Sequence, residues 1–187
     1  MTAFLVTGAT GMLGGYVSSM ADAQGYETIA PPRSEWDLRN PGSIAAIIKK
    51  VKPAYVLHLA AKTDVDACER DPASAAQMNV TATEEIAKAT AEVGGWLAYI
   101  STGCVFGGAG KPTYNELDLP CPVHYYGRSK LWGEYAVNKH LPFNHLIVRA
   151  GWMIGGRPDQ DHKFDGKIIS QIRNGASQIK AVADKHR

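Results

Sequence analysis

The sequence has few cysteines and no long apolar run. Its three cysteines, Cys68, Cys104 and Cys121, are an odd number without paired spacing, so neither a disulfide framework nor a zinc site is expected. No apolar window reaches the roughly 20 residues that a membrane span needs. The residues before the first strand-like run also have none of the features of an export signal. These absences predict a cytoplasmic protein without a membrane partner or a bound metal.

The chain also has no large excess of charge of either sign. Lys and Arg number 20 against 18 Asp and Glu, which gives a formal net charge of +2, and the two signs are interspersed. No nucleic-acid partner is therefore indicated, and any anionic ligand must be held locally. Hydrophobic residues make up 45% of the 187 residues, which is the ordinary composition of one main globular domain with at most a small appendage.

Short apolar runs alternate with longer amphipathic ones along the chain. The predicted strands are residues 4–7, 27–30, 55–59, 96–101 and 145–149. The predicted helices are one through Leu13 to Met20, then 41–52, 73–93 and 126–139, and one that ends at Arg173; a last strand-like run covers 179–182. This alternation is typical of the α/β class, with a doubly wound parallel sheet covered by helices on both faces, the Rossmann fold.

A glycine-rich turn joins the first predicted strand to the first helix. Its glycines, Gly8, Gly11 and Gly14, are spaced three apart instead of in the usual two-then-three pattern. Glycine permits a tight turn and close backbone approach, and a helix N-terminus offers free N–H groups to a pyrophosphate. The turn therefore predicts a dinucleotide site, with Thr10, Met12 and Leu13 beside the glycines. The alternative is a turn that serves only to pack the helix on the sheet.

The residues after the second predicted strand bear on which dinucleotide is bound. An acidic residue there would hydrogen-bond the ribose hydroxyls and select NAD(H), but this chain has Pro32 followed by Arg33. A guanidinium can pair with a ribose 2′-phosphate, which favours NADP(H) and leaves NAD(H) open. The alternative is a solvent-exposed arginine without a ligand.

The segment 126–130 contains Tyr-x-x-x-Lys, which places Tyr126 and Lys130 on the same face of a predicted helix. A tyrosine with a pKa near 10 is a poor acid–base catalyst at neutral pH, and a neighbouring ammonium favours its phenolate. The pattern alone is weak, because Tyr135 and Lys139 repeat it. For that second copy we expect a pair on the helix surface.

In combination these motifs resemble the extended short-chain dehydrogenase/reductase superfamily, and within it the dTDP-4-dehydrorhamnose reductase family. The resemblance covers the whole chain. The segments that carry it are 7–14, 37–38, 58–66, 79–80, 101–102, 105–106, 126–131 and 149–152. It implies that Asp37 and Leu38 lie by the adenine of the cofactor. The other residues that it implies in cofactor binding are Leu59, Ala60, Ala61, Thr63, Asn79, Tyr126 and Lys130.

The resemblance further implies a catalytic triad of Thr102, Tyr126 and Lys130 that reduces a 4-keto deoxysugar nucleotide in dTDP-L-rhamnose synthesis. Thr102 would hold the reacting carbonyl oxygen while Tyr126 delivers a proton. The sequence departs from the family pattern at Gly103-Cys104 and at Ala150-Gly151, both beside the expected sugar pocket. Cys104 and Trp152 are therefore the candidate substrate residues, and the identity of the sugar stays open.

The same motifs are compatible with other activities. The alternatives are another extended family member, such as a nucleotide-sugar epimerase or dehydratase, and a non-catalytic subunit resembling the regulatory subunit of methionine adenosyltransferase. Residues 1–150 are expected to form the NAD(P)-binding domain. Residues 151–187 would be the start of a truncated substrate-binding part, so we expect cofactor affinity to survive and substrate affinity to be lost. A homodimer is left open.

Overall fold

The computed structural model describes residues 3–108, 111, 113–155 and 164–179, and its centre is a five-stranded sheet in the order β2-β1-β3-β4-β5. Every neighbouring pair of strands is parallel. The strands are β1 (Ala3–Thr7), β2 (Glu27–Ile29), β3 (Tyr55–His58), β4 (Trp96–Thr102) and β5 (His145–Ala150). The strand order reverses between β1 and β3, and such a switch point leaves a crevice outside the carboxyl ends of the strands.

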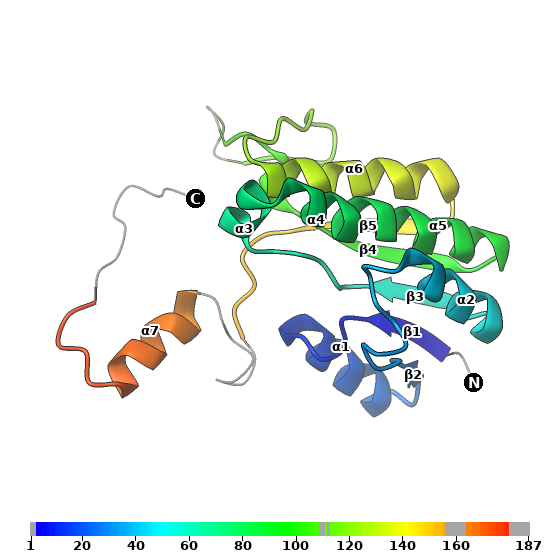
Figure 1. The fold of residues 1–187 in the computed structure, drawn as a ribbon, viewed down its shortest axis with the longest axis horizontal. Helices are drawn as coiled ribbons and strands as arrows, with labels where there is room; N and C mark the ends of the chain where they lie inside the picture. Colours follow the sequence, from blue (N-terminus) through cyan, green and yellow to red (C-terminus); the bar gives the residue numbers. More distant parts are fainter. Residues whose placement is uncertain (1–2, 109–110, 112, 156–163, 180–187) are drawn as a thin grey trace.

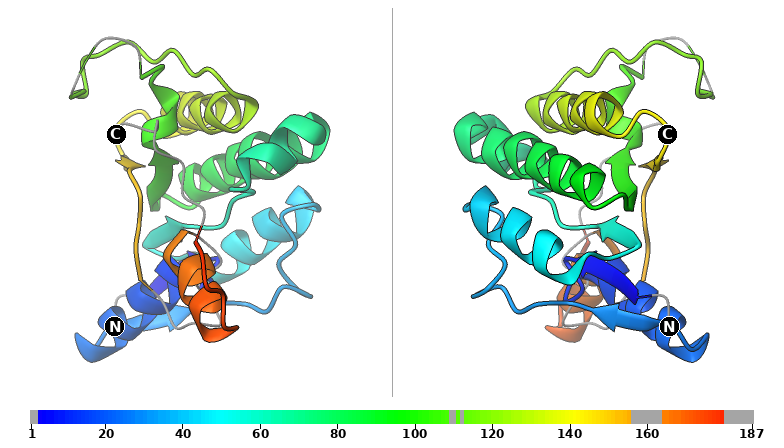
Figure 2. Two further views of the ribbon diagram at one scale, coloured as in Figure 1. Left: turned by 90° about the vertical axis from the view of Figure 1, so that its left-hand side faces the viewer. Right: turned by 90° about the vertical axis from the view of Figure 1, so that its right-hand side faces the viewer.

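Helices cover both faces of this sheet, as the doubly wound prediction requires. The helices α2 (Pro41–Val51), α5 (Ala82–Glu92) and α6 (Tyr125–His140) lie side by side on one face, and α1 (Met12–Ala23) lies on the other (Figures 1 and 2). Between the sheet and the three-helix layer is a core of fully buried side chains. Its members include Leu5, Ile44, Ile48, Val56, Ile86, Leu97, Tyr99 and Val137.

The segment between β3 and β4 differs from the sequence prediction. A short helix, α3 (Val65–Arg70), was not predicted; its N-cap Asp64 accepts a hydrogen bond from the Ala67 N–H at 2.7 Å. Six residues are too few to show a helical period. The single helix predicted over 73–93 is instead α4 (Pro72–Ala76), a π-helical turn (Gln77–Thr81) and α5. Such a turn holds one more residue than an α-helical turn, often at a functional site.

The C-terminal part is described only in places. Helix α7 (Phe164–Arg173) confirms the helix predicted to end at Arg173, and Gly175 follows it with a φ of 78°, a left-handed conformation that glycine adopts without strain. The predicted loop over 151–161 is described only to residue 155, and of the strand-like run 179–182 only Ile179 lies within the described residues. In the described part of the chain, no helix is long and apolar enough to cross a membrane.

Candidate functional site

A pocket of about 440 Å³ opens at the carboxyl ends of β1, β2 and β3. It lies at the switch point of the sheet, where open α/β folds bind their ligands. Twelve of the residues predicted to bind a cofactor line it, from four separate segments of the chain. They are Gly8, Thr10, Gly11, Met12, Leu13, Arg33, Asp37, Leu38, Leu59, Ala60, Ala61 and Thr63.

The glycine turn is too close to its surroundings to carry side chains. Gly8 has a φ of 71°, and a Cβ there would lie 2.9 Å from the Ala60 nitrogen. A Cβ on Gly14 would lie 2.1 Å from the Gly8 carbonyl oxygen. Helix α1 begins at Met12 without a side-chain cap, so its first N–H groups stay available at the pocket wall to a ligand. The turn can therefore cradle an anionic group such as a pyrophosphate.

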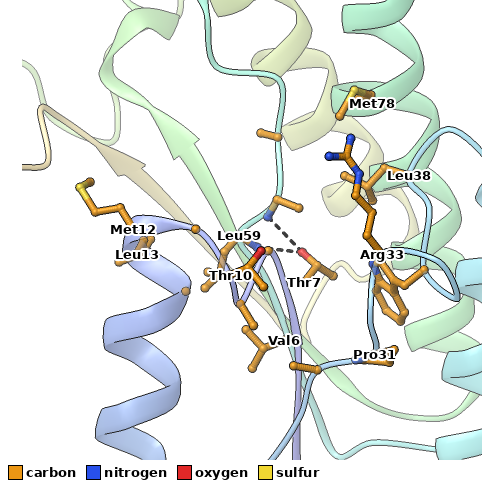
Figure 3. A pocket seen from close by; sticks show the side chains of 18 of the residues that line it. Val6, Thr7, Thr10, Met12, Leu13, Pro31, Arg33, Leu38, Leu59 and Met78 are labelled. Carbon is orange, nitrogen blue, oxygen red and sulfur yellow. Dashed lines mark hydrogen bonds between the residues drawn. The ribbon is translucent and has the colours of Figure 1, made fainter. Parts of the chain in front are cut away.

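A buried hydrogen-bond network holds the strand ends beneath this turn. The Thr7 oxygen accepts from the backbone N–H groups of Leu59 and Ala60 at 3.1 and 3.0 Å (Figure 3). His58 bonds Thr7 through Nδ1 at 2.8 Å and Thr83 through Nε2 at 3.0 Å. Burial lowers the pKa of His58 to about 3, with a smaller contribution from Lys130. His58 is thus neutral and structural, and no sequence motif identified this network.

Charged residues line the pocket across from the start of helix α1. Figure 3 shows Met12 and Leu13 on one side and Arg33 with Leu38 on the other. The Asp37 carboxylate is paired with Arg39, a residue that the sequence did not single out, at 2.7 Å. The side-chain hydrogen bond from Arg39 lowers the pKa of Asp37 to about 2.

The structure brings two of the three predicted catalytic residues into contact. Thr102 ends β4 and is 7% exposed, and Tyr126 lies in the first turn of α6. Burial raises the pKa of Tyr126, and a hydrogen bond with the Thr102 side chain opposes that rise. The Thr102 oxygen also accepts from the Cys104 N–H at 3.2 Å, the local role that a hydroxyl at a strand end commonly has. The two hydroxyls can therefore act on one oxygen atom.

Lys130 is placed differently from the simple expectation. It is 1% exposed, and its Nζ lies 4.0 Å from the centroid of the Tyr99 ring. Burial lowers the pKa of Lys130 to about 7, and the charge of Glu134 acts in the opposite direction. The pKa of Tyr126 is raised and not lowered, because the desolvation of its phenolate outweighs the hydrogen bond with the Thr102 side chain. Lys130 is therefore a buried amine packed over an aromatic ring, and its charge near neutral pH is reduced by burial.

The other predicted residues lie outside the pocket lining. Asn79, in the π-helical turn, bonds both the N–H and the carbonyl of Lys62 at 2.8 and 2.9 Å, and it donates to the Ser129 hydroxyl at 2.9 Å. It therefore ties the segment after β3 to α6. Cys104 is half-buried beside Thr102, and Trp152 is 60% exposed. A substrate role for these two stays a prediction.

The second Tyr-x-x-x-Lys copy lies on the surface. Tyr135 is 57% exposed, and Lys139 bonds Glu84 at 3.1 Å. This arrangement is the surface pair that was expected.

A buried ion pair beside Thr102 was missed by the sequence. Glu134, whose side chain is 3% exposed, accepts from the Ser101 hydroxyl at 2.5 Å and from Arg149 at 2.7 Å. It joins α6 to the ends of β4 and β5, which are far apart in sequence. No local pattern could have revealed it.

Comparisons with known proteins relate the whole chain to one family. The model described as the RmlD substrate binding domain matches residues 1–187. A dTDP-4-dehydrorhamnose reductase of Burkholderia thailandensis is 39% identical over 181 residues, which are 97% of this chain and 59% of that protein. The crystal structure of dTDP-4-dehydrorhamnose reductase from Yersinia enterocolitica is 54% identical, with a TM-score of 0.92, over 99% of this chain and 64% of that one.

A further solved structure includes a cofactor in its description. The Bacillus anthracis dTDP-4-dehydrorhamnose reductase in complex with NADP is 28% identical, with a TM-score of 0.85, over 92% of this chain and 60% of that one. The chain spans between 40% and 59% of the length of the curated relatives that it matches.

Proposed function

The chain belongs to the family of the RmlD substrate binding domain, and from that premise we propose that it carries the cofactor site and catalytic hydroxyls of an NADP(H)-dependent reductase. The substrate is a 4-keto deoxysugar nucleotide, as the name dTDP-4-dehydrorhamnose reductase of its relatives suggests. One observation carries the proposal: Thr102 and Tyr126 lie close enough for the Thr102 side chain to lower the pKa of Tyr126, in the same fold as the glycine-turn pocket. Reduction of a carbonyl group needs both features.

The pocket residues fit a phosphorylated dinucleotide. At Gly8 and Gly14 a Cβ would clash with neighbouring protein atoms, so glycine is needed for the turn to close. Helix α1 begins beside this turn without a side-chain cap, so its first N–H groups can receive a pyrophosphate. Arg33 on the far wall is suited to a 2′-phosphate. A related structure contains NADP, which supports the choice of NADP(H) over NAD(H). When bound, the reduced nicotinamide supplies a hydride.

The hydroxyl pair performs the remaining part of the reduction. Thr102 and Tyr126 would donate hydrogen bonds to the carbonyl oxygen and hold it in one position. As the carbon receives the hydride, the carbonyl π bond breaks and the oxygen takes the Tyr126 proton, which gives the alcohol. Burial raises the pKa of Tyr126, so its hydroxyl is protonated and ready to donate at neutral pH. The family resemblance implies that Lys130 holds the nicotinamide ribose, but the structure packs its amine against Tyr99 at 1% exposure, so this ribose contact stays a prediction.

Titration of both cofactors tests the binding half of this proposal. NADPH should bind more tightly than NADH, and Arg33→Ala should weaken NADPH alone, by about tenfold, because it removes a charge-assisted bond. If NADH binds at least as tightly and Arg33→Ala changes neither affinity, the assignment of NADP(H) is wrong.

The catalytic half is tested by following the nicotinamide absorbance with a panel of keto-sugar nucleotides. Oxidation of NADPH that depends on both the sugar nucleotide and Tyr126 supports the proposal. If NADPH binds but no member of the panel is reduced, this chain does not perform the reaction by itself. The domain boundary at residue 150, a homodimer, a cytoplasmic location and the substrate roles of Cys104 and Trp152 stay predictions.

A further inference from the structure

Among the described residues that line the pocket, two carry charge, and their charges are opposite. They are Arg33 and Asp37, which are four residues apart in the segment after β2. The two are close enough for the charge of Arg33 to act on the Asp37 carboxylate. An arginine and an aspartate at such a site can form a bidentate pair with each other. In that pair the guanidinium would be occupied and unable to meet a ligand phosphate.

Arg39 prevents this pairing, because it binds the Asp37 carboxylate. Arg39 donates from Nε to Oδ1 and Oδ2 of Asp37 at 3.0 Å each, and from its second guanidinium nitrogen to Oδ2 at 2.7 Å. The backbone N–H of Arg39 adds a bond to Oδ1 at 2.9 Å. The carbonyl of Arg39 is itself held by the Gln77 amide at 2.8 Å. Both carboxylate oxygens of Asp37 are therefore already occupied by one fixed partner.

Arg33 keeps its guanidinium uncommitted. Within the described part of the chain, it takes part in none of the ion pairs or side-chain hydrogen bonds, although Asp37 is near. The charges of Arg33, Asp37 and Arg39 sum to +1 for this segment, whereas those of Arg33 and Asp37 alone sum to zero. The net positive charge favours a phosphate dianion on the ribose, and a neutral Arg33–Asp37 pair would not.

We propose that Arg39 is a positioning residue that sets cofactor choice. By holding the Asp37 carboxylate, it leaves the Arg33 guanidinium free for a ribose 2′-phosphate. This inference rests on the proposed cofactor site, and it adds a residue outside the pocket lining to the determinants of NADP(H) over NAD(H). Contacts of Asp37 with the adenine would be common to both cofactors, so they cancel in the ratio of the two affinities.

The test measures dissociation constants for NADPH and NADH by nicotinamide fluorescence, on the 187-residue chain and four variants. Arg39→Ala should lower the preference for NADPH by about threefold to tenfold, because Asp37 then competes for Arg33. Arg39→Ala combined with Asp37→Asn should restore the preference, since the competing charge is gone. Arg33→Ala should abolish it. Lys49→Ala, which removes a cation paired with Glu92 away from the pocket, should leave the preference unchanged.

The outcomes separate this inference from the function on which it rests. If the unaltered chain binds neither NADPH nor NADH, the cofactor site is refuted and the role of Arg39 is refuted with it. If both bind with a preference that Arg39→Ala does not change, only the role of Arg39 is refuted. Failure of Asp37→Asn to rescue the Arg39 variant would also overturn it, because a merely structural defect would not respond to removal of the carboxylate charge. Circular dichroism of each variant confirms folding.

Discussion

Replacement of Lys130 by methionine should weaken cofactor binding. It should also remove the part of the pH dependence of the unfolding free energy that comes from burying this amine. Lys130 is 1% exposed, and burial lowers its pKa from 10.5 to about 7. Methionine keeps the length and the apolar part of the side chain and removes the ammonium. The substitution therefore isolates the cost of burying a charge at this position.

The sign of the pH dependence follows from the two pKa values. Between pH 7 and 10.5 the unfolded chain keeps a proton on Lys130 that the folded chain has lost, so unfolding takes up a proton and stability rises with pH. Below pH 7 both states are protonated, and the cost of burial is present in full. From pH 6 to pH 9 the free energy of unfolding of the unaltered protein should rise by about 3 kcal/mol relative to Lys130→Met, at about 1.4 kcal/mol for each pH unit above the folded pKa.

Urea unfolding of both proteins at pH 6 and pH 9 measures this difference. A reducing agent is needed because Cys68, Cys104 and Cys121 are all free. His58, whose pKa falls from 6.5 to about 3 on folding, adds a rise in stability near pH 6 to both proteins, so its contribution cancels in the difference between them. The pair of Glu134 with Arg149 is left unaltered by the substitution. A difference in unfolding free energy that stays constant from pH 6 to pH 9 would refute the reasoning.

Three further predictions concern the hydroxyl pair, the glycine turn and the buried ion pair. Tyr126→Phe should reduce turnover at least about 100-fold with cofactor affinity nearly unchanged, because only the proton donor is lost; comparable loss in Tyr135→Phe would place the chemistry elsewhere. Gly14→Ala should abolish NADPH binding in a titration, since its Cβ would lie 2.1 Å from a backbone oxygen of the turn, and normal affinity would contradict this. Glu134→Gln should lower the free energy of unfolding by about 3 kcal/mol in urea, because Arg149 keeps a partly buried charge without its partner; an unchanged midpoint would count against a stabilising pair.

Much of the fold followed from the sequence because it is encoded locally. The alternation of apolar runs determined five strands and their helices, and a parallel sheet follows from strands joined through helices. The glycine spacing at Gly8 and Gly14 located the pocket, since only backbone fits where those two residues approach their neighbours. The Tyr-x-x-x-Lys spacing placed Tyr126 and Lys130 one turn apart on α6. Each of these features depends on residues within a few positions of one another.

The tertiary structure decided the contacts between segments, which no local sequence pattern predicts. Folding set the short helix α3, the π-helical turn that buries Asn79, and the ion pair of Glu134 with Arg149 across two elements. Even the pairing of Arg39 with Asp37, only two residues apart, was not evident, because an arginine near a carboxylate in sequence can point elsewhere. The sequence supplied the charged groups, and the packing of the strand ends determined which of them meet and how deeply each is buried. Burial then set the direction in which the pKa values of Tyr126 and Lys130 shift.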